Sequence, residues 1–319
     1  MLPIIILLVN LPSAEACPRC PGDPILTTAT ATSTIALLTI ATLNTKGTLW
    51  SRDGASLQAL AKTMLDKTLH ILVLTETSPQ NTTSSPRTPA QHKREETIIS
   101  QTFKLHQITT ISSSTSTQTG SVAILLHPLI AARLNPTQHP PKPAHKGRWL
   151  ELALTFPTGQ LDIAGIYGDA SAGPIPSTIQ QTLRAQTLTF ADPTQDNHHK
   201  LLLGDLNEVH SRRDTANLDR NLHLSGILDA LHNETELVDT FRLTDPDRTG
   251  YSFFPPATTA NSNPNIGCSR LDYVFASPSL LNDYAQICTT INQCGDIISL
   301  PSQDHRAVIT QFPHFDTTT

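Results

Sequence analysis

The segment Lys200-Leu-Leu-Leu-Gly-Asp-Leu-Asn207 places a short apolar run directly before a carboxylate and an amide. Such a run is typical of a buried strand, and strand ends are where a sheet presents reactive side chains to solvent. A second segment, Ser302-Gln-Asp-His-Arg306, places a carboxylate and an imidazole before the apolar run 307–312. The two segments together predict a reactive site that is assembled at strand ends.

Four more polar residues stand at the ends of apolar runs in the same way: Asn44, Glu76, Tyr167 and Asp272. Carboxylate oxygens hold Mg²⁺, and an imidazole can donate or accept a proton near neutral pH. Acids, an amide, a phenol and an Asp-His pair are the groups needed to cut a phosphodiester with a divalent metal. The residue types therefore favour metal-assisted phosphodiester chemistry.

Composition and charge limit the function classes. The chain has 319 residues, which suffice for one large or two ordinary domains, and its formal net charge is −5. A protein that coats nucleic acid would be strongly basic, so this class is disfavoured. A metal-dependent nuclease can still be acidic, because its metal site needs carboxylates and the ion supplies local positive charge.

The N-terminal region has the character of a leader. We expect residues 1–34 to be a leader and 35–319 to form the folded domain. The apolar run Leu2–Val9 is too short to span a bilayer, so no stable membrane association is expected. The five cysteines, including Cys17-Pro-Arg-Cys20, are expected to be ordinary thiols of a nuclear or intracellular protein. The alternative is secretion, with Ala14-Glu-Ala16 as a cleavage site.

Hydrophobic periodicity predicts interleaved strands and helices with polar loops at 78–91 and 135–147. Expected strands are 35–43, 70–75, 103–111, 120–126, 148–156, 160–167, 200–203, 251–254, 270–275 and 307–312; expected helices are 54–69, 175–190 and 222–231. Because many strands follow one another directly, the pattern favours mixed sheets with helices outside.

Three acidic or amide residues have candidate roles in this chemistry, and each has an ordinary alternative. Asp205 could accept a proton from water while Asn207 donates a hydrogen bond to a phosphate oxygen. The alternative is a Gly-Asp turn followed by a loop asparagine. Glu76 could hold Mg²⁺ together with water and substrate oxygens, or could be a solvated glutamate after a strand.

The Asp-His pair suggests a charged or proton-transferring imidazole. His305 needs an orienting acid, and Asp304 points elsewhere if the chain is extended there. We therefore expect Asp272 to orient His305, which leaves Asp304 free for the metal. A surface Asp-His in a loop is the alternative.

The remaining candidates lie beside these residues. Asn44 and Tyr167 could be buried structural hydrogen-bonding groups, and Tyr167 could also bind the phosphate. Lys46 could contact the substrate backbone or could be a solvated lysine.

As an ordered set, these motifs resemble the endonuclease/exonuclease/phosphatase superfamily over residues 35–313. The residues that carry the resemblance are Asn44, Glu76, Tyr167, Gly204-Asp-Leu-Asn207, Arg270-Leu-Asp-Tyr273 and Ser302-x-Asp-His305. The resemblance implies a four-layer α/β sandwich, in which two mixed β-sheets pack face to face with helices outside.

Finer motifs are similar to the endonuclease domain of LINE-type, non-LTR retrotransposons, which nicks DNA to prime reverse transcription. They are Gly120-Ser-Val-Ala-Ile124, Gly147-Arg-Trp-Leu-Glu151, Ile166-Tyr-Gly168, Leu237-Val-Asp-Thr-Phe-Arg242, Pro246–Phe254 and Ser269-Arg-Leu-Asp-Tyr273. This resemblance implies duplex DNA as substrate, a reverse transcriptase as a partner in a parent element, and Mg²⁺ as cofactor with Mn²⁺ as an alternative.

The resemblance also implies roles for individual residues. Glu76 would hold the metal, with Asp304 as a second ligand. Asp205 would activate the attacking water; Asn207, Tyr167 and His305 would bind the phosphate, and Asp272 would orient His305. Asn44, Lys46 and Arg270 are expected on the substrate side.

The sequence departs from the family pattern in three places. Lys46 stands where many relatives carry a second acid, which puts a two-metal scheme in doubt. Ala170 replaces an expected asparagine, which weakens any carry-over of phosphate or abasic-site contacts to that position. Ser269 stands where apurinic enzymes carry an aromatic residue, which favours the retroelement class over a repair enzyme.

Two other functions stay open from the sequence alone. One is a phosphatase that acts on a lipid headgroup or a small phosphoester. The other is a catalytically inactive binding domain, which the retention of the site residues disfavours.

Overall fold

The computed structural model describes residues 35–47, 55–77, 89–113, 121–134, 141–157, 159–170, 177–193, 198–216, 226–255, 267–281, 286–291, 304–313 and 315, the side chains of 89–96 excepted. The expected leader at 1–34 lies outside the described residues.

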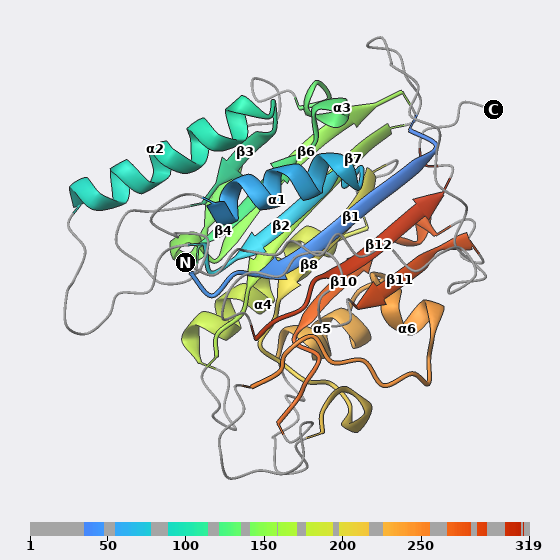
Figure 1. Cartoon of the computed structure of the whole chain (residues 1–319). Helices are drawn as coiled ribbons and strands as arrows, with labels where there is room; N and C mark the ends of the chain where they lie inside the picture. The colour runs from blue at the N-terminus through green and yellow to red at the C-terminus, as the bar shows by residue number, and fades with distance from the viewer. Residues whose placement is uncertain are drawn as a thin grey trace.

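Two six-stranded sheets form the centre of the molecule (Figure 1). The first sheet has the order β11-β12-β1-β2-β4-β3. Its strands are β1 (Leu37–Asn44), β2 (Ile71–Thr75), β3 (Thr109–Ser112), β4 (Val122–Leu126), β11 (Cys288–Ile291) and β12 (Val308–Pro313). The second has the order β5-β6-β7-β8-β10-β9. Its strands are β5 (Lys142–Ala144), β6 (Trp149–Phe156), β7 (Gly159–Tyr167), β8 (His198–Asp205), β9 (Val238–Asp239) and β10 (Asp272–Ala276).

Each sheet is mixed, with one parallel pair near its centre. β1 pairs with β2 in parallel and with β12 in antiparallel orientation. In the second sheet β7 and β8 are parallel, whereas β10 pairs antiparallel with β8. The carboxyl ends of β1, β2, β7 and β8 and the amino ends of β10 and β12 consequently gather the site residues.

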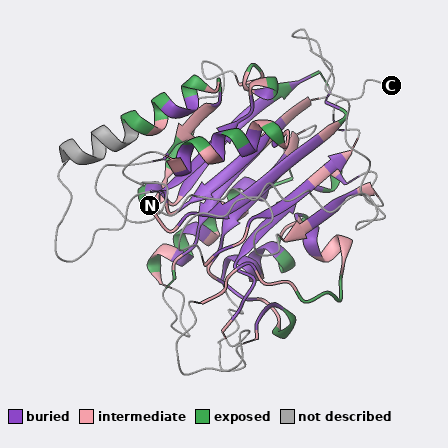
Figure 2. Cartoon of the chain, in the orientation of Figure 1, coloured by how far each residue is buried: buried purple, intermediate pink, exposed green. Residues whose placement is uncertain are grey.

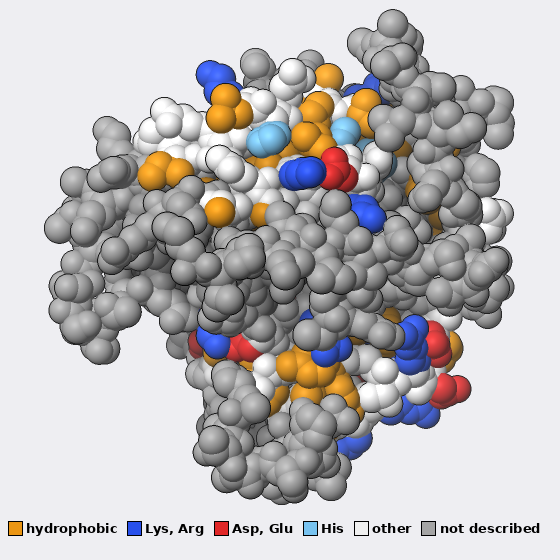
Figure 3. Space-filling model, viewed as in Figure 1, with side chains coloured by type: hydrophobic (Ala, Val, Ile, Leu, Met, Phe, Trp, Pro, Cys, Tyr) orange, Lys and Arg blue, Asp and Glu red, His pale blue; other side chains and the backbone are white. Residues whose placement is uncertain are grey.

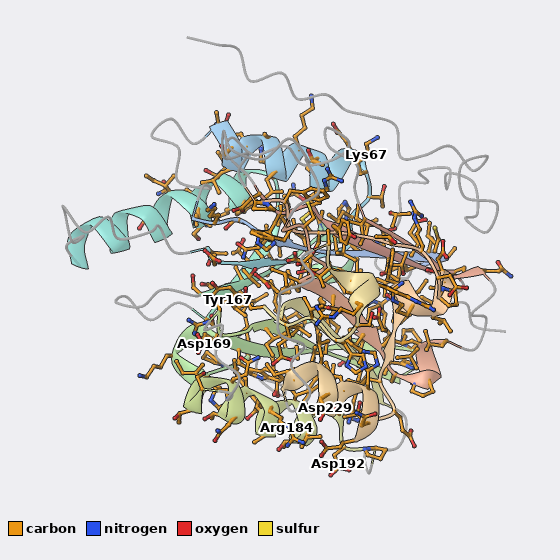
Figure 4. All side chains as sticks on the ribbon, turned by 90° about the horizontal axis from the view of Figure 1, so that it is seen from below. Lys67, Tyr167, Asp169, Arg184, Asp192 and Asp229 are labelled. Carbon is orange, nitrogen blue, oxygen red and sulfur yellow. The ribbon has the colours of Figure 1, made fainter. Side chains whose placement is uncertain are left out.

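Helices cover the outer faces of both sheets, as the view in Figure 4 shows. They are α1 (Ala55–Asp66), α2 (Pro89–Leu105), α3 (Pro128–Ala131), α4 (Thr178–Ala191), α5 (Ile227–Asn233) and α6 (Thr240–Thr244), with short 3-10 turns at His145–Gly147, Arg212–Asp214 and Pro278–Leu280. Side chains of α1 and α2 pack on the first sheet, and side chains of α4 and α5 pack on the second. The expected four-layer α/β sandwich is therefore confirmed.

Successive side chains of the central strands point alternately toward the other sheet and toward the helices, and both sides are buried. The sequences of these strands are therefore apolar at nearly every position. In β2, Ile71 and Val73 face the other sheet, whereas Leu72 and Leu74 face the helices. In β8, Leu201 likewise packs between the sheets. Strands that are buried on both faces need apolar residues at every position, and Figure 2 shows them buried along their length.

Four expected elements differ from the structure. The loop expected at 135–147 contains β5 and the 3-10 turn His145–Gly147. The expected loop 78–91 ends in α2, and the strand expected at 103–111 is the end of α2 followed by the shorter β3. Ile99 and Phe103 pack against the α1 layer, and their spacing of four residues is helical. The strand expected at 251–254 is wrong, because Phe253 forms isolated bridges instead.

Two cysteines lie among the described residues, and their states differ. Cys268 is a buried free thiol, but Cys288 is disulfide-bonded, so the expectation of ordinary thiols is wrong for Cys288.

Within the described part of the chain, none of the helices has the length and apolarity needed to cross a membrane.

Candidate active site

The register of the strands brings the predicted residues to one edge of the sandwich. Asn44 lies opposite Thr75 in the parallel pair β1–β2, so that Glu76 follows directly beyond it. In the second sheet, Asp205 lies opposite Tyr167 on one side and opposite Asp272 on the other. Residues that are far apart in the sequence thus become neighbours because their strands end together.

Asn44 connects the two sheets. Its side-chain Nδ2 donates to Glu76 Oε1 at 2.9 Å and to Asp205 Oδ2 at 2.7 Å. Tyr167, labelled in Figure 4, makes a second connection through its hydroxyl, which donates to Glu76 Oε1 at 2.7 Å. Burial and the adjacent Glu76 raise the pKa of Tyr167, which keeps the phenol protonated and therefore a hydrogen-bond donor.

His305 and Asp272 form a buried pair, as expected from the sequence. His305 Nδ1 lies 2.7 Å from Asp272 Oδ2, and its Nε2 lies 4.0 Å from Asp205 Oδ2. Burial opposes a charged imidazole, but the charge of Asp272 and its hydrogen bond, together with Asp205, outweigh burial and raise the pKa of His305 to about 9. A protonated His305 can donate a hydrogen bond from Nε2 to a phosphate oxygen.

Asp205 is fully buried and has a perturbed acidity. Burial and the nearby charge of Asp272 raise the pKa of Asp205 to about 7, although His305 and the hydrogen bonds from Asn44 and Asn207 oppose the rise. A carboxylate whose pKa lies near the working pH is well suited to accept a proton from water. The role of Asp205 as a base stays a prediction.

Three site residues have left-handed backbone conformations. Lys46 has φ 48°, Glu76 has φ 50° and Asn207 has φ 54°. Such conformations are uncommon for residues other than glycine and cost about 1–3 kcal/mol each, and they tend to cluster at functional sites. Each is held by a local hydrogen bond; for example, the Asn207 N–H donates to Asp205 Oδ1 at 2.8 Å.

Gly168 and Arg148 support Asn207 and were not among the predicted site residues. The Gly168 carbonyl accepts from Asn207 Nδ2 at 3.1 Å and from Arg148 Nη1 at 2.8 Å. The Arg148 guanidinium stacks on the Tyr167 ring at 4.6 Å. A side chain at Gly168 would place its Cβ 2.0 Å from the Leu206 carbonyl oxygen. Both residues belong to motifs that marked the family resemblance, which was the available signal.

Ser252 was also missed. Its Oγ accepts the backbone N–H groups of Leu271 and Asp272, each at 3.0 Å. These bonds fix the backbone just before β10 and so position the Asp272 carboxylate. The Pro246–Phe254 motif contains Ser252, but nothing in the sequence distinguishes it from its neighbours.

Lys46 and Asp304 meet across the site in an ion pair. The prediction that Asp304 is free for a metal is therefore wrong for its Oδ2, which the Lys46 ammonium contacts. Its Oδ1 is buried without a hydrogen-bond partner among the described residues. Lys46 is accordingly not a simple solvated lysine.

Arg270 does not reach the substrate side, and this prediction is corrected. Its guanidinium is 1% exposed and lies between Asp214, at 2.8 Å, and Asp239, at 2.7 Å. It also stacks on Phe241 and Tyr273. A buried cation that is paired with two carboxylates serves the structure by anchoring the segment before Asp272, because it has no free donor face for a phosphate.

Two groups could hold a divalent ion. Glu76 is partly exposed, and no described residue hydrogen-bonds its Oε2. Asp205, Asp272 and His305 also place ligand atoms within 4.8 Å of one another. In that second group both Asp205 oxygens and His305 Nδ1 already make hydrogen bonds. An open hard oxygen suits Mg²⁺, which retains several waters, so Glu76 fits the ion better.

Comparisons with known proteins identify the fold and the family. Solved structures that share the fold include an AP endonuclease from Archaeoglobus fulgidus, with 18% identity over 86% of this chain and 98% of that one and a TM-score of 0.56. The AP endonuclease LMAP from Leishmania major has 14% identity over 97% of each chain and a TM-score of 0.61. The 3′ phosphatase NExo from Neisseria, bound to a product DNA hairpin, has 17% identity over 86% and 99% and a TM-score of 0.59.

At these identities the structural matches show the fold alone. A sequence search of curated proteins gives no significant match. The profile of the Endonuclease/Exonuclease/phosphatase family matches residues 41–291, which is most of the chain and includes Asn44, Glu76, Asp205 and Asp272. The chain belongs to the endonuclease/exonuclease/phosphatase family.

Proposed function

We propose that this protein is a Mg²⁺-dependent endonuclease that nicks duplex DNA, of the type carried by non-LTR retroelements. The observation that carries the proposal is the meeting of Glu76, Asp205 and the His305–Asp272 pair at one edge of the sandwich, joined by Asn44. A metal-binding carboxylate, a base and a phosphate-binding cation are the three components that phosphodiester hydrolysis requires.

The roles follow from the surroundings of each residue. Glu76 would hold the ion, which when bound polarises phosphate oxygens. Asp205, with its pKa near 7, orients the attacking water and accepts its proton. Protonated His305 donates to a phosphate oxygen from Nε2, while Asp272 fixes the ring through Nδ1. Tyr167 contributes its phenol as a hydrogen-bond donor.

Asn207 completes the phosphate contacts. One N–H of its side-chain amide is engaged by the Gly168 carbonyl, which fixes the plane of the amide. An amide has two such donors, so the second can reach a phosphate oxygen. Asn207 is therefore a preorganised donor, because folding fixes the orientation of its amide before the substrate binds.

DNA as the substrate is supported by the family, by a structural neighbour that was solved with a DNA hairpin, and by the retroelement-like motifs. Among the described residues on the face in Figure 3, several Lys and Arg side chains stand beside Asp or Glu. We therefore expect moderate salt dependence of DNA binding rather than that of a strongly basic protein. In a parent element, a reverse transcriptase would use the nicked strand as its primer.

The test is the nicking of supercoiled plasmid with Mg²⁺, with and without EDTA, by the wild type and His305→Ala. His199→Ala is the matched control, because His199 is half-buried and bonds Ser279 at 3.0 Å, at the opposite end of β8 from Asp205. We expect nicking that requires the ion, is lost in His305→Ala and is retained in His199→Ala.

Two results would contradict the proposal. Equal nicking by the wild type and His305→Ala would assign the activity elsewhere. Intact plasmid together with rapid hydrolysis of a soluble phosphoester would favour a phosphatase.

A further inference from the structure

We infer that the Lys46 ammonium is a built-in cation of this site, so that the protein binds a single divalent ion, on Glu76, and leaves Asp304 to Lys46. The inference rests on the proposed metal-dependent function and specifies how many ions that function uses. Its basis is the position of Lys46 relative to the carboxylates of the site.

The backbone fixes Lys46 at this position. The Lys46 N–H donates to Asn44 Oδ1 at 2.8 Å, and the following Gly47 N–H donates to the Glu76 carbonyl at 2.8 Å. Thr45 Oγ1 also donates to the Glu76 carbonyl, at 2.9 Å. The turn that carries Lys46 is therefore hydrogen-bonded to Asn44, the last residue of β1, and to Glu76, the proposed metal ligand.

The ion pair reaches across a large separation in the sequence. Lys46 and Asp304 are 258 residues apart, and Asp304 lies immediately before His305. The Asp304 side chain is 9% exposed and that of Lys46 is 35% exposed, so the carboxylate is nearly buried while its cation still reaches solvent. Such a pair offsets the charge of Asp304, and the Lys46 side chain stays partly accessible to solvent.

The remaining carboxylates are less accessible to an ion than Glu76. Asp205 and Asp272 are fully buried, and His305 bonds Asp272. Glu76 is the one site carboxylate among the described residues that is both partly exposed and free of a basic partner. A second divalent ion on Asp304 would have to displace the Lys46 ammonium or lie next to it, and repulsion between the two positive charges opposes the second arrangement.

The experiment is a titration of the purified full chain with MnCl₂ alone, without DNA, in which electron paramagnetic resonance counts the bound ions. Variants are Lys46→Asp, Lys46→Arg, Asp304→Asn and Glu76→Gln, with circular dichroism melting to show that each one folds. Lys67→Asp is the matched control; Lys67 lies just beyond α1, away from Tyr167 in Figure 4.

We expect one Mn²⁺ per chain in the wild type, Lys46→Arg, Asp304→Asn and Lys67→Asp, and none in Glu76→Gln. Lys46→Asp should bind a second ion, or bind one ion at least about tenfold more tightly, because a cation has become an anion.

Several outcomes would overturn the inference. These are two ions in the wild type, loss of the ion in Asp304→Asn, or a Lys46→Asp variant that binds Mn²⁺ as the wild type does. One Mn²⁺ in the wild type without plasmid nicking would remove the proposed endonuclease function but leave the single-ion site standing. No Mn²⁺ binding by the wild type would overturn both.

Discussion

Replacing Asp272 by Asn should change His305 from a charged to a neutral imidazole at neutral pH. In the wild type the pKa of His305 rises from 6.5 to about 9, because the charge of Asp272 and the 2.7 Å hydrogen bond outweigh the effect of burial. A rise of this size corresponds to about 3 kcal/mol in favour of the protonated ring. Without Asp272 the burial of His305 dominates, and its pKa falls well below the wild-type value.

Activity should report this change. Loss of the charged donor should lower kcat/KM for plasmid nicking by roughly 100-fold or more. Catalysis needs Asp205 ionised and His305 protonated, so the wild-type rate should rise through about pH 7 and fall above about pH 9. In Asp272→Asn the decline should begin at a lower pH.

The direct measurement is an NMR titration of the imidazole nitrogens, with the His305 signal identified by its absence in His305→Gln. Asp229→Asn serves as the control, because Asp229 is a half-buried carboxylate of α5 that bonds Asn233 (Figure 4). The reasoning is refuted if wild-type His305 titrates near 6.5, or if Asp272→Asn keeps both the titration and the nicking rate of the wild type.

Three further predictions concern stability. Arg270→Leu removes the cation between two buried carboxylates, of which Asp214 retains its ion pair with Arg242, and should cost about 3–5 kcal/mol in urea unfolding; a loss below about 1 kcal/mol would contradict the structural role of Arg270. Burial lowers the pKa of His70 to about 3, so the ring stays neutral in the folded protein. The free energy of unfolding should therefore be unaffected by His70 above about pH 6.5 and should fall by about 1.4 kcal/mol per pH unit as the pH drops from there toward 3. His70→Asn should flatten this slope, and an unchanged slope would refute the assignment to His70. Gly204→Ala places a Cβ 1.9 Å from the Ile166 carbonyl oxygen and should lower the melting temperature sharply, whereas a wild-type melting curve would show that β7 and β8 can separate at that point.

The edge of the sheet was predictable because the central strands are buried on both faces. The short apolar runs 71–74 and 201–203 favour such strands, and polar residues follow each run within two positions. Glu76 follows β2 of one sheet and Asp205 ends β8 of the other, so strand pairing alone does not bring them together, and their common site was predicted from the family resemblance. Asp272 as the partner of His305 followed from the geometry of an extended chain, in which adjacent side chains point to opposite sides.

The partners of the basic residues were not predictable. Arg270 lies in the same motif as Asp272, but its burial depends on Asp239 and Asp214, which are 31 and 56 residues away. Lys46 pairs with a carboxylate that is 258 residues away. A charge in a motif has the same appearance in the sequence whether it faces substrate or a buried counterion, because only packing decides which partner it meets.

The strained residues of the site explain why the sandwich and the chemistry depend on each other. Lys46, Glu76 and Asn207 occupy left-handed conformations that an isolated loop would rarely adopt. Two of them are held by backbone N–H groups that bond Asn44 and Asp205, and these two side chains bond each other across the sheets. A shift of one sheet against the other would therefore break the Asn44 bridge and release the loops together, which links the precision of the catalytic geometry to the packing of the central core.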